Sequence, residues 1–166
     1  MDELRIAVVG AGRTGRTHAE RLCRQIRGAR LVAVTTSSGE RAHAVRSSCG
    51  DIRVHATLDQ LLDDESLDAV VIASSTSAHV DNVVRCAAAG LHILCEKPLA
   101  LDLEGCDRAM AAAEAADITL MVGHVRRFDS GYLEARRLIE DGAVGRPVLY
   151  RSISGAMHPP PPSFAD

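Results

Sequence analysis

The sequence predicts an α/β fold in which a parallel sheet of short buried strands is covered by helices. Two observations lead to this prediction. Short apolar runs alternate with segments of helical periodicity along the chain, and the composition supplies a core of aliphatic side chains. Hydrophobic residues make up 46% of the 166 residues and aromatic residues only 2%. Such a core of Val, Leu, Ile and Ala is typical of strands that are buried on both faces.

Each apolar run has the length of one buried strand. In chain order the runs are Leu4–Val9, Leu31–Thr35, Ala69–Ala73, Leu91–Cys95 and Ile118–Val122. Between them, apolar residues recur at helical spacing, as in Ala19, Leu22, Cys23 and Ile26, in Val80, Val83, Val84, Ala87 and Ala88, and in Leu103, Cys106, Met110 and Ala113. Because strands that alternate with helices are joined by right-handed crossovers, the sheet is expected to be parallel and doubly wound.

The pattern changes near Gly123. A polar helix is predicted over Asp129–Glu140 and a strand over Arg146–Ser154, before a run of prolines that follows His158. We therefore predict one domain over residues 1–123. Residues 124–166 are expected to be the start of a truncated second domain of α+β type, present here only as far as its first strand.

Charge and cysteine content exclude several classes of function. The net charge is −3 and the pI is about 6.1, so no electrostatic case exists for nucleic acid or an anionic membrane as partner. The five cysteines are widely spaced without a CxxC pair, which favours reduced thiols over disulfides or a metal site. The chain enters its first strand almost at once, without a signal-type segment, so a cytoplasmic protein is expected.

A glycine-rich loop follows the first predicted strand. Gly10, Gly12 and Gly15 have the spacing G-x-G-x-x-G at the start of a predicted helix, where a Rossmann fold binds the pyrophosphate of a dinucleotide. The helix dipole and free N–H groups attract the anion. Arg13 and Arg16 add positive charge, and Thr14 completes the predicted binding loop. A glycine-rich turn without a ligand is the alternative, and a kinase-type loop is disfavoured because no VAIK-like strand or DFG motif follows.

The end of the second predicted strand indicates which dinucleotide is bound. An acidic residue here would bind the ribose hydroxyls of NAD and repel a 2′-phosphate. The sequence instead has Thr36 and Ser37, whose hydroxyls can donate to a phosphate, and Arg41, which can pair with it. We therefore predict a preference for NADP over NAD. The alternative is that the hydroxyls cap the next helix and that Arg41 is solvated.

A more specific signal is the triplet Glu96-Lys97-Pro98 after the strand that ends in HILC. Together with VVGAGRTGRTH and ASSTSAH, it resembles the Gfo/Idh/MocA family of glucose-fructose oxidoreductases and inositol dehydrogenases, from about Leu4 to Ser154. The resemblance implies an NAD- or NADP-dependent oxidoreductase that transfers a hydride to or from a hydroxyl-bearing carbon of a sugar, inositol or related polyol.

The resemblance also implies roles for residues of the triplet. Lys97 is the catalytic residue, whose ammonium stabilises charge on the substrate oxygen and can move its proton. Glu96 and Pro98 lie beside the cofactor, and the bond before Pro98 is cis. An ordinary strand-end turn with a solvated lysine is the alternative.

Further residues are expected near the cofactor because they follow parallel strands at the edge where such sheets bind ligands. They are Ser74, Ser75, Thr76 and His79, with Arg126 at the crossing to the second domain. His79 is equally well explained as a helix N-terminal residue with local hydrogen bonds, and Arg126 as a surface residue. His18 is interpreted as a packing or capping residue, and His92 and Cys95 as core residues, so no metal is expected.

Members of the resembled family continue into a sheet domain that provides the substrate wall and a D-x-x-x-H motif, which this chain lacks. Three interpretations follow. The chain is the cofactor half of a sugar or polyol oxidoreductase, a non-enzymatic NAD(P)-binding module, or a reductase whose substrate site is completed by another subunit. The second domain is expected to serve substrate binding or oligomerisation, and self-association is left open.

Overall fold

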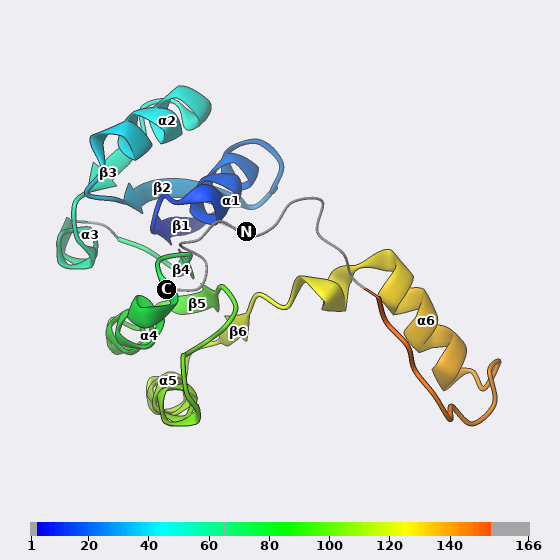
Figure 1. Cartoon of the computed structure of the whole chain (residues 1–166). Coiled ribbons are helices and arrows are strands. Elements are labelled where there is room, and N and C mark those ends of the chain that lie inside the picture. Colours follow the sequence, from blue (N-terminus) through cyan, green and yellow to red (C-terminus); the bar gives the residue numbers. More distant parts are fainter. Residues whose placement is uncertain (1–2, 65, 154–166) are drawn as a thin grey trace. The chain divides into compact units, whose positions relative to one another are not determined.

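The computed structural model describes residues 3–64 and 66–153, which divide into two compact units after His124. Within these residues the first unit holds a parallel sheet of six strands in the order β3-β2-β1-β4-β5-β6 (Figure 1). The strands are β1 Leu4–Val9, β2 Ala29–Thr35, β3 Arg53–His55, β4 Ala69–Ile72, β5 His92–Cys95 and β6 Leu120–Val122. The doubly wound parallel fold and the five predicted strands are confirmed, whereas β3 was not predicted.

Helices connect successive strands of the first unit. They are α1 Arg13–Arg24, α2 Gly39–Cys49, α3 Leu58–Asp64, the short 3₁₀ helix η1 Thr76–Ala78, α4 His79–Ala88 and α5 Leu103–Ala115. The second unit contains the 3₁₀ helix η2 Val125–Phe128 and α6 Ser130–Glu140, which begins after its N-cap Asp129 as the sequence predicts. No described helix is long and apolar enough to cross a membrane.

The sheet of the first unit has a separate core on each face, because successive side chains of a strand point to opposite sides. Val8 of β1 packs with Leu22 of α1 and Val45 of α2. Its neighbours Ala7 and Val9 belong to the opposite core, which also contains residues of α3, α4 and α5. Figure 1 shows the corresponding helices above and below the strands. Helices thus cover both faces of the strands, as the apolar runs predict.

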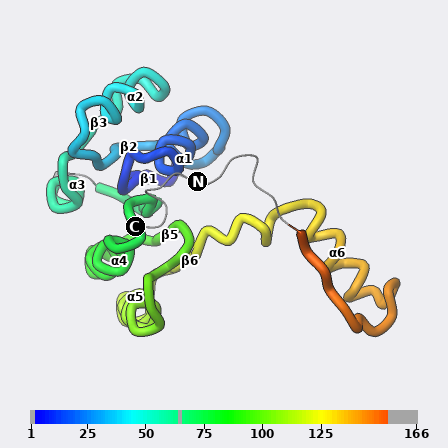
Figure 2. The backbone as a smooth tube through the Cα atoms, in the orientation of Figure 1, coloured from blue at the N-terminus to red at the C-terminus, as the bar shows by residue number. Residues whose placement is uncertain are grey.

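The order of the strands creates the place where a ligand can bind. From β1 the chain moves outward through β2 to β3, and then returns to place β4 on the other side of β1 (Figure 2). The connections that leave β1 and β4 therefore turn to opposite faces of the sheet. In open sheets of this kind, the crevice at the carboxyl ends of such strands is the usual ligand site.

The strand predicted over Arg146–Ser154 is wrong for the residues that the structure describes. Residues 146–153 have no strand structure, and Val148 and Ile153 are 92% and 81% exposed. Their β-type composition cannot form a ladder because none of the described residues pairs with them. Ser154 and the prolines after His158 lie outside the described residues.

Two buried thiols give a testable property of the core. Cys86 and Cys95 are 0% exposed, and burial raises the pKa of each thiol from an ordinary value of 9.0 to about 12. We expect iodoacetamide at mildly alkaline pH to spare both residues in the folded chain and to modify both after unfolding. Peptide mass spectrometry checks this, with the half-buried Cys106 as the internal control.

Modification of Cys86 or Cys95 as fast as that of Cys106, without unfolding, would contradict this prediction. The same pKa shifts also have a consequence for stability. Unfolded thiols ionise near pH 9.0, whereas the buried ones stay protonated to about pH 12, so the contribution of these thiols to stability is lost as the pH rises through this window.

Candidate functional site

The glycine-rich loop between β1 and α1 is shaped by close backbone contacts. Gly10 has a positive φ of 97°, and its N–H lies within hydrogen-bond distance of both the carbonyl oxygen (3.2 Å) and Oγ1 (3.0 Å) of Thr35. A Cβ atom at Gly15 would lie 1.8 Å from the carbonyl oxygen of Gly10. Helix α1 therefore packs directly on the loop, as the G-x-G-x-x-G spacing predicts.

The start of α1 suits an anion. Gly12 is the N-cap and brings no side chain to bond the first N–H groups, and the first turn contains no acidic residue. Arg13 begins the helix and is exposed, and the half-buried Thr14 follows it. Free N–H groups, the positive end of the helix dipole and a cationic side chain together attract a negatively charged group.

A pocket of about 460 Å³ lies over the carboxyl ends of β1, β2 and β4. Many of the predicted site residues line it, namely Gly10, Gly12, Thr36, Ser37, Arg41, Ser74 and Ser75. Sequence reasoning missed Ala56, Thr57, Leu58 and Asn82, which also line it. Asn82 donates from Nδ2 to Oγ of Ser74 at 3.0 Å. Polar lining of this kind can orient a ligand within a concave site.

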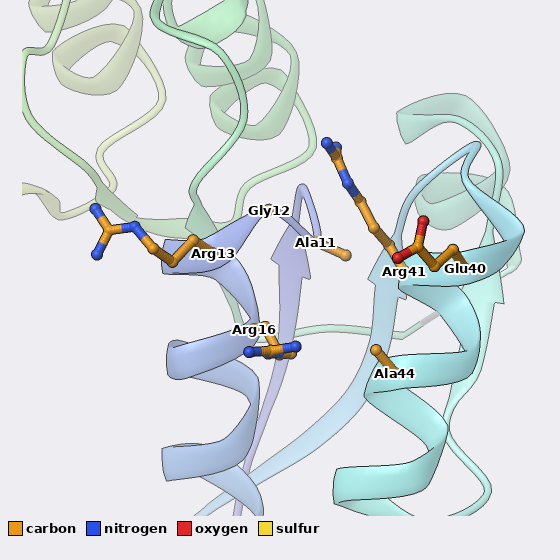
Figure 3. Close-up of a pocket in the computed structure, with 7 residues that line it drawn as sticks. All are labelled: Ala11, Gly12, Arg13, Arg16, Glu40, Arg41 and Ala44. Atoms are coloured by element: carbon orange, nitrogen blue, oxygen red, sulfur yellow. The ribbon is translucent and has the colours of Figure 1, made fainter. Parts of the chain in front are cut away.

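A smaller neighbouring pocket of about 270 Å³ lies where α1 and α2 begin (Figure 3). Three arginines line it, Arg13, Arg16 and Arg41, together with Glu40. Figure 3 shows Arg41 extending from the first turn of α2 while Arg13 points to the other side of α1. Arg16 is 3.7 Å from Oε1 of Glu20 in an exposed ion pair. Since Arg41 lines both pockets, its charge is available at the ligand end of β2.

The hydroxyl groups after β2 have distinct local contacts. Oγ1 of Thr36 accepts from the N–H of Ser38 at 3.2 Å, and Oγ of Ser38 accepts from the N–H of Arg41 at 3.3 Å as the cap of α2. The helix cap is therefore Ser38, and not Thr36 or Ser37. A hydroxyl that accepts one bond keeps its own proton to donate, so Thr36 can still bond a ligand oxygen.

The end of β5 carries the predicted catalytic triplet. The Lys97–Pro98 peptide bond is cis, which confirms that expectation, and Lys97 is exposed. Glu96 is half-buried: its Oε1 lies 2.8 Å from Nε2 of His18, and its Oε2 accepts from the N–H of Lys97 at 3.3 Å. His18, interpreted from the sequence as a packing or capping residue, thus connects α1 to the triplet. The triplet does not line the larger pocket.

The segment after β4 contributes both lining and support. His79 is only 2% exposed, with Nδ1 2.8 Å from the carbonyl oxygen of Pro98 and Nε2 3.2 Å from that of Ser74. A neutral imidazole donates to one of these oxygens, and an imidazolium donates to both. Of the two interpretations of His79, local hydrogen bonding describes this geometry. Thr76 begins η1 and, like His79, does not line the larger pocket.

Arg126 belongs to the second unit and has contacts within it. Its Nη1 lies 3.2 Å from Oδ2 of Asp129, and its guanidinium carbon lies 5.4 Å from the ring centre of Tyr132. The predicted role of Arg126 at the cofactor stays a prediction. Among the described residues, no group of three or more His, Cys, Asp or Glu side chains is placed to hold a metal ion.

The sequence profile of the Gfo/Idh/MocA oxidoreductase family, with its NAD-binding Rossmann fold, matches residues 4–124. The chain is 36% identical over 158 residues to myo-inositol 2-dehydrogenase of Thermotoga maritima, with 95% of this chain and 47% of that protein covered. It is 35% identical over 162 residues to scyllo-inositol 2-dehydrogenase (NAD(+)) of Bacillus subtilis, with 98% and 47% covered.

A solved structure agrees with these sequence relatives. Scyllo-inositol dehydrogenase from Lactobacillus casei, with bound NAD(H) and scyllo-inositol, matches with a TM-score of 0.82 at 30% identity, covering 87% of this chain and 43% of that one. The chain thus spans about half the length of the curated relatives that it matches.

Proposed function

The chain belongs to the Gfo/Idh/MocA oxidoreductase family with its NAD-binding Rossmann fold, and from this premise we propose that it is the cofactor half of an enzyme that transfers a hydride between a nicotinamide dinucleotide and a hydroxyl-bearing carbon of an inositol or related polyol. The observation that carries the proposal is the edge formed by the glycine loop, the polar pocket and the triplet that follows β5. The relatives named as inositol dehydrogenases support the substrate class.

In the proposed complex, the pyrophosphate contacts the N–H groups at the start of α1, near Gly12 and Arg13. Ser74 and Ser75 line the pocket on the β4 side and can bond the middle of the dinucleotide. The nicotinamide supplies the hydride chemistry when the cofactor is bound. Lys97, at the end of β5, is the proposed catalytic residue: its ammonium bonds the substrate oxygen, stabilises its developing charge and exchanges its proton.

The finer proposal is that NADP is preferred over NAD. Thr36 and Ser37 line the pocket at the end of β2, where a carboxylate would repel a 2′-phosphate, and Arg41 lines it beside them. A charge-assisted bond from the guanidinium to the phosphate would be absent with NAD. The curated relative from Bacillus subtilis is named for NAD(+), so the preference proposed here belongs to this chain's own residues.

The second unit, from Val125 onward, has the role of a link in this proposal. We place the cofactor domain in residues 1–123 and assign residues 124–166 to the start of a domain for substrate binding or oligomerisation. The division of the chain after His124 supports this boundary. The exposed apolar side chains of α6, Leu133 and Ile139, suit a helix that packs against further structure.

The proposed function is tested by binding and turnover measured on the same chain. We expect calorimetric titration to detect NADPH binding, and absorbance of the reduced nicotinamide to appear when an inositol is added with the oxidised cofactor. Lys97→Met is expected to retain cofactor binding while turnover falls by about 100-fold, because one positioned donor to the reacting oxygen is lost.

The outcomes separate the parts of the proposal. Binding without turnover of any inositol or related polyol by the unaltered chain would contradict the proposed reaction for this chain and keep the dinucleotide site. Absence of binding to NADPH and NADH would contradict both. Turnover of Lys97→Met at the rate of the unaltered chain would remove Lys97 from the catalytic role.

A further inference from the structure

Lys97 has a singular position in this chain, because the 19 basic residues comprise one lysine, Lys97, and otherwise only arginines. Its side chain is exposed, so side-chain packing does not fix its direction. The backbone on either side of it is held instead. The contacts come from two histidines that belong to different helices, His18 on α1 and His79 on α4.

The first contact lies on the N-terminal side of Lys97. Nε2 of His18 lies 2.8 Å from Oε1 of Glu96, and both side chains are 22% exposed, which protects the pair from much of the solvent. The other oxygen of the same carboxylate accepts the N–H of Lys97 at 3.3 Å. The orientation of the Glu96 carboxylate, and with it the bond to the Lys97 backbone, therefore depends on His18.

The second contact lies on the C-terminal side. Nδ1 of the buried His79 lies 2.8 Å from the carbonyl oxygen of Pro98, the residue after Lys97. The other ring nitrogen faces the carbonyl oxygen of Ser74 at 3.2 Å, and Ser74 lines the larger pocket. His79 thus ties the triplet after β5 to the backbone that ends β4.

We propose that His18 and His79 are positioning residues that clamp the backbone around Lys97, His18 through the Glu96 carboxylate and His79 through the Pro98 carbonyl. His18 lies on the helix that begins at the glycine loop, and His79 bonds the segment that lines the dinucleotide pocket. The clamp therefore fixes the lysine relative to both sides of the cofactor site. This inference rests on the proposed function in that Lys97 acts on the substrate there.

The single lysine makes the clamp directly observable, because a chain labelled with ¹⁵N-lysine has one backbone amide signal, that of Lys97. Amide hydrogen exchange and ¹⁵N relaxation of this signal report how firmly the segment is held. Neither needs cofactor or turnover. A failure of the clamp is thus distinguishable from a failure of the proposed reaction, which the NADPH titration and the inositol assay test separately.

The substitutions exploit the two ring nitrogens. An asparagine amide reaches about as far as Nδ1 of histidine and a glutamine amide about as far as Nε2. His18 uses Nε2, so His18→Gln is expected to keep the Lys97 signal as in the unaltered chain, and His18→Asn to speed amide exchange by about tenfold and increase mobility. His79 uses Nδ1 toward Pro98, so the expected order is reversed: His79→Asn keeps the signal and His79→Gln loosens it.

A structural disturbance that is not specific to these contacts would not follow this opposite order. His43→Ala, at an exposed histidine of α2 that contacts Ser47, is the control and is expected to leave the Lys97 signal unchanged. Circular dichroism verifies that each variant is folded. An unchanged Lys97 signal in folded His18→Asn, or the same response to Asn and Gln at both histidines, would overturn the clamp.

Discussion

Gly15→Ala is expected to lower the free energy of unfolding by about 3 kcal/mol or more and to abolish dinucleotide binding. A Cβ atom at this position would lie 1.8 Å from the carbonyl oxygen of Gly10 and 2.9 Å from its carbonyl carbon. Both atoms belong to the backbone of the glycine loop, so no side-chain rotation can relieve the contact. Either α1 or the loop must move, and the N–H groups then lose their arrangement. Urea unfolding and calorimetric titration with NADPH measure the two effects.

Gly12→Ala provides the matched comparison. A Cβ atom there meets nothing within 4 Å, and the backbone angles of Gly12, φ −67° and ψ −173°, suit any residue. This variant should therefore lose less than about 1 kcal/mol of stability, the size of an N-cap effect. Its methyl group should nevertheless obstruct the approach of the pyrophosphate and weaken NADPH binding. Equal stability of the two variants would contradict the packing role assigned to Gly15.

Thr36→Asp is expected to reverse the cofactor preference of the chain from NADPH to NADH. The carboxylate would accept hydrogen bonds from both ribose hydroxyls of NADH and repel the 2′-phosphate of NADPH. We expect NADPH affinity to fall by about 100-fold and NADH affinity to rise several-fold, in line with the gain or loss of charge-assisted hydrogen bonds. The turn should survive, since a carboxylate can also accept the N–H of Ser38 that Oγ1 of Thr36 now accepts.

Two further variants make this experiment specific. Arg41→Ala should lower NADPH affinity by about tenfold and leave NADH affinity unchanged, because only the 2′-phosphate is proposed to contact the guanidinium. Ser47→Asp adds the same charge at an exposed position of α2 that lines neither described pocket, and should change neither affinity. A Thr36→Asp chain that still favours NADPH, or an Arg41→Ala chain with full NADPH affinity, would contradict the proposed phosphate contacts.

The parts of the fold that depend on periodicity could be predicted from the sequence. The five apolar runs gave strands because buried parallel strands need continuous apolar residues, and the glycine spacing identified the loop before α1. The edge strand β3, Arg53–His55, has only three residues and no apolar run, so periodicity could not detect it. Residues 146–153 have the composition of a strand, but composition cannot reveal that a pairing partner is absent from the described residues.

The candidate site was predictable only as far as its residues follow strands in the sequence. The contact between His18 and Glu96 joins residues separated by 78 positions, and no spacing rule links them. Asn82 lies on α4, where its helical position does not indicate that it bonds Ser74. Such contacts depend on side-chain directions that are fixed only when helices pack on the sheet. They are therefore tertiary properties, and a single sequence reports them weakly.

The central place of β1 in the sheet has a consequence for the order of events during synthesis. This strand pairs with β2, which soon follows it, but also with β4, so its second edge stays open until the ribosome has passed Ile72. The glycine loop rests on the same late segment, since a Cβ at Gly10 would lie 2.8 Å from the carbonyl oxygen of Ala73. The dinucleotide can therefore act only as a late ligand, which stabilises the finished domain by mass action and cannot guide the nascent half of it.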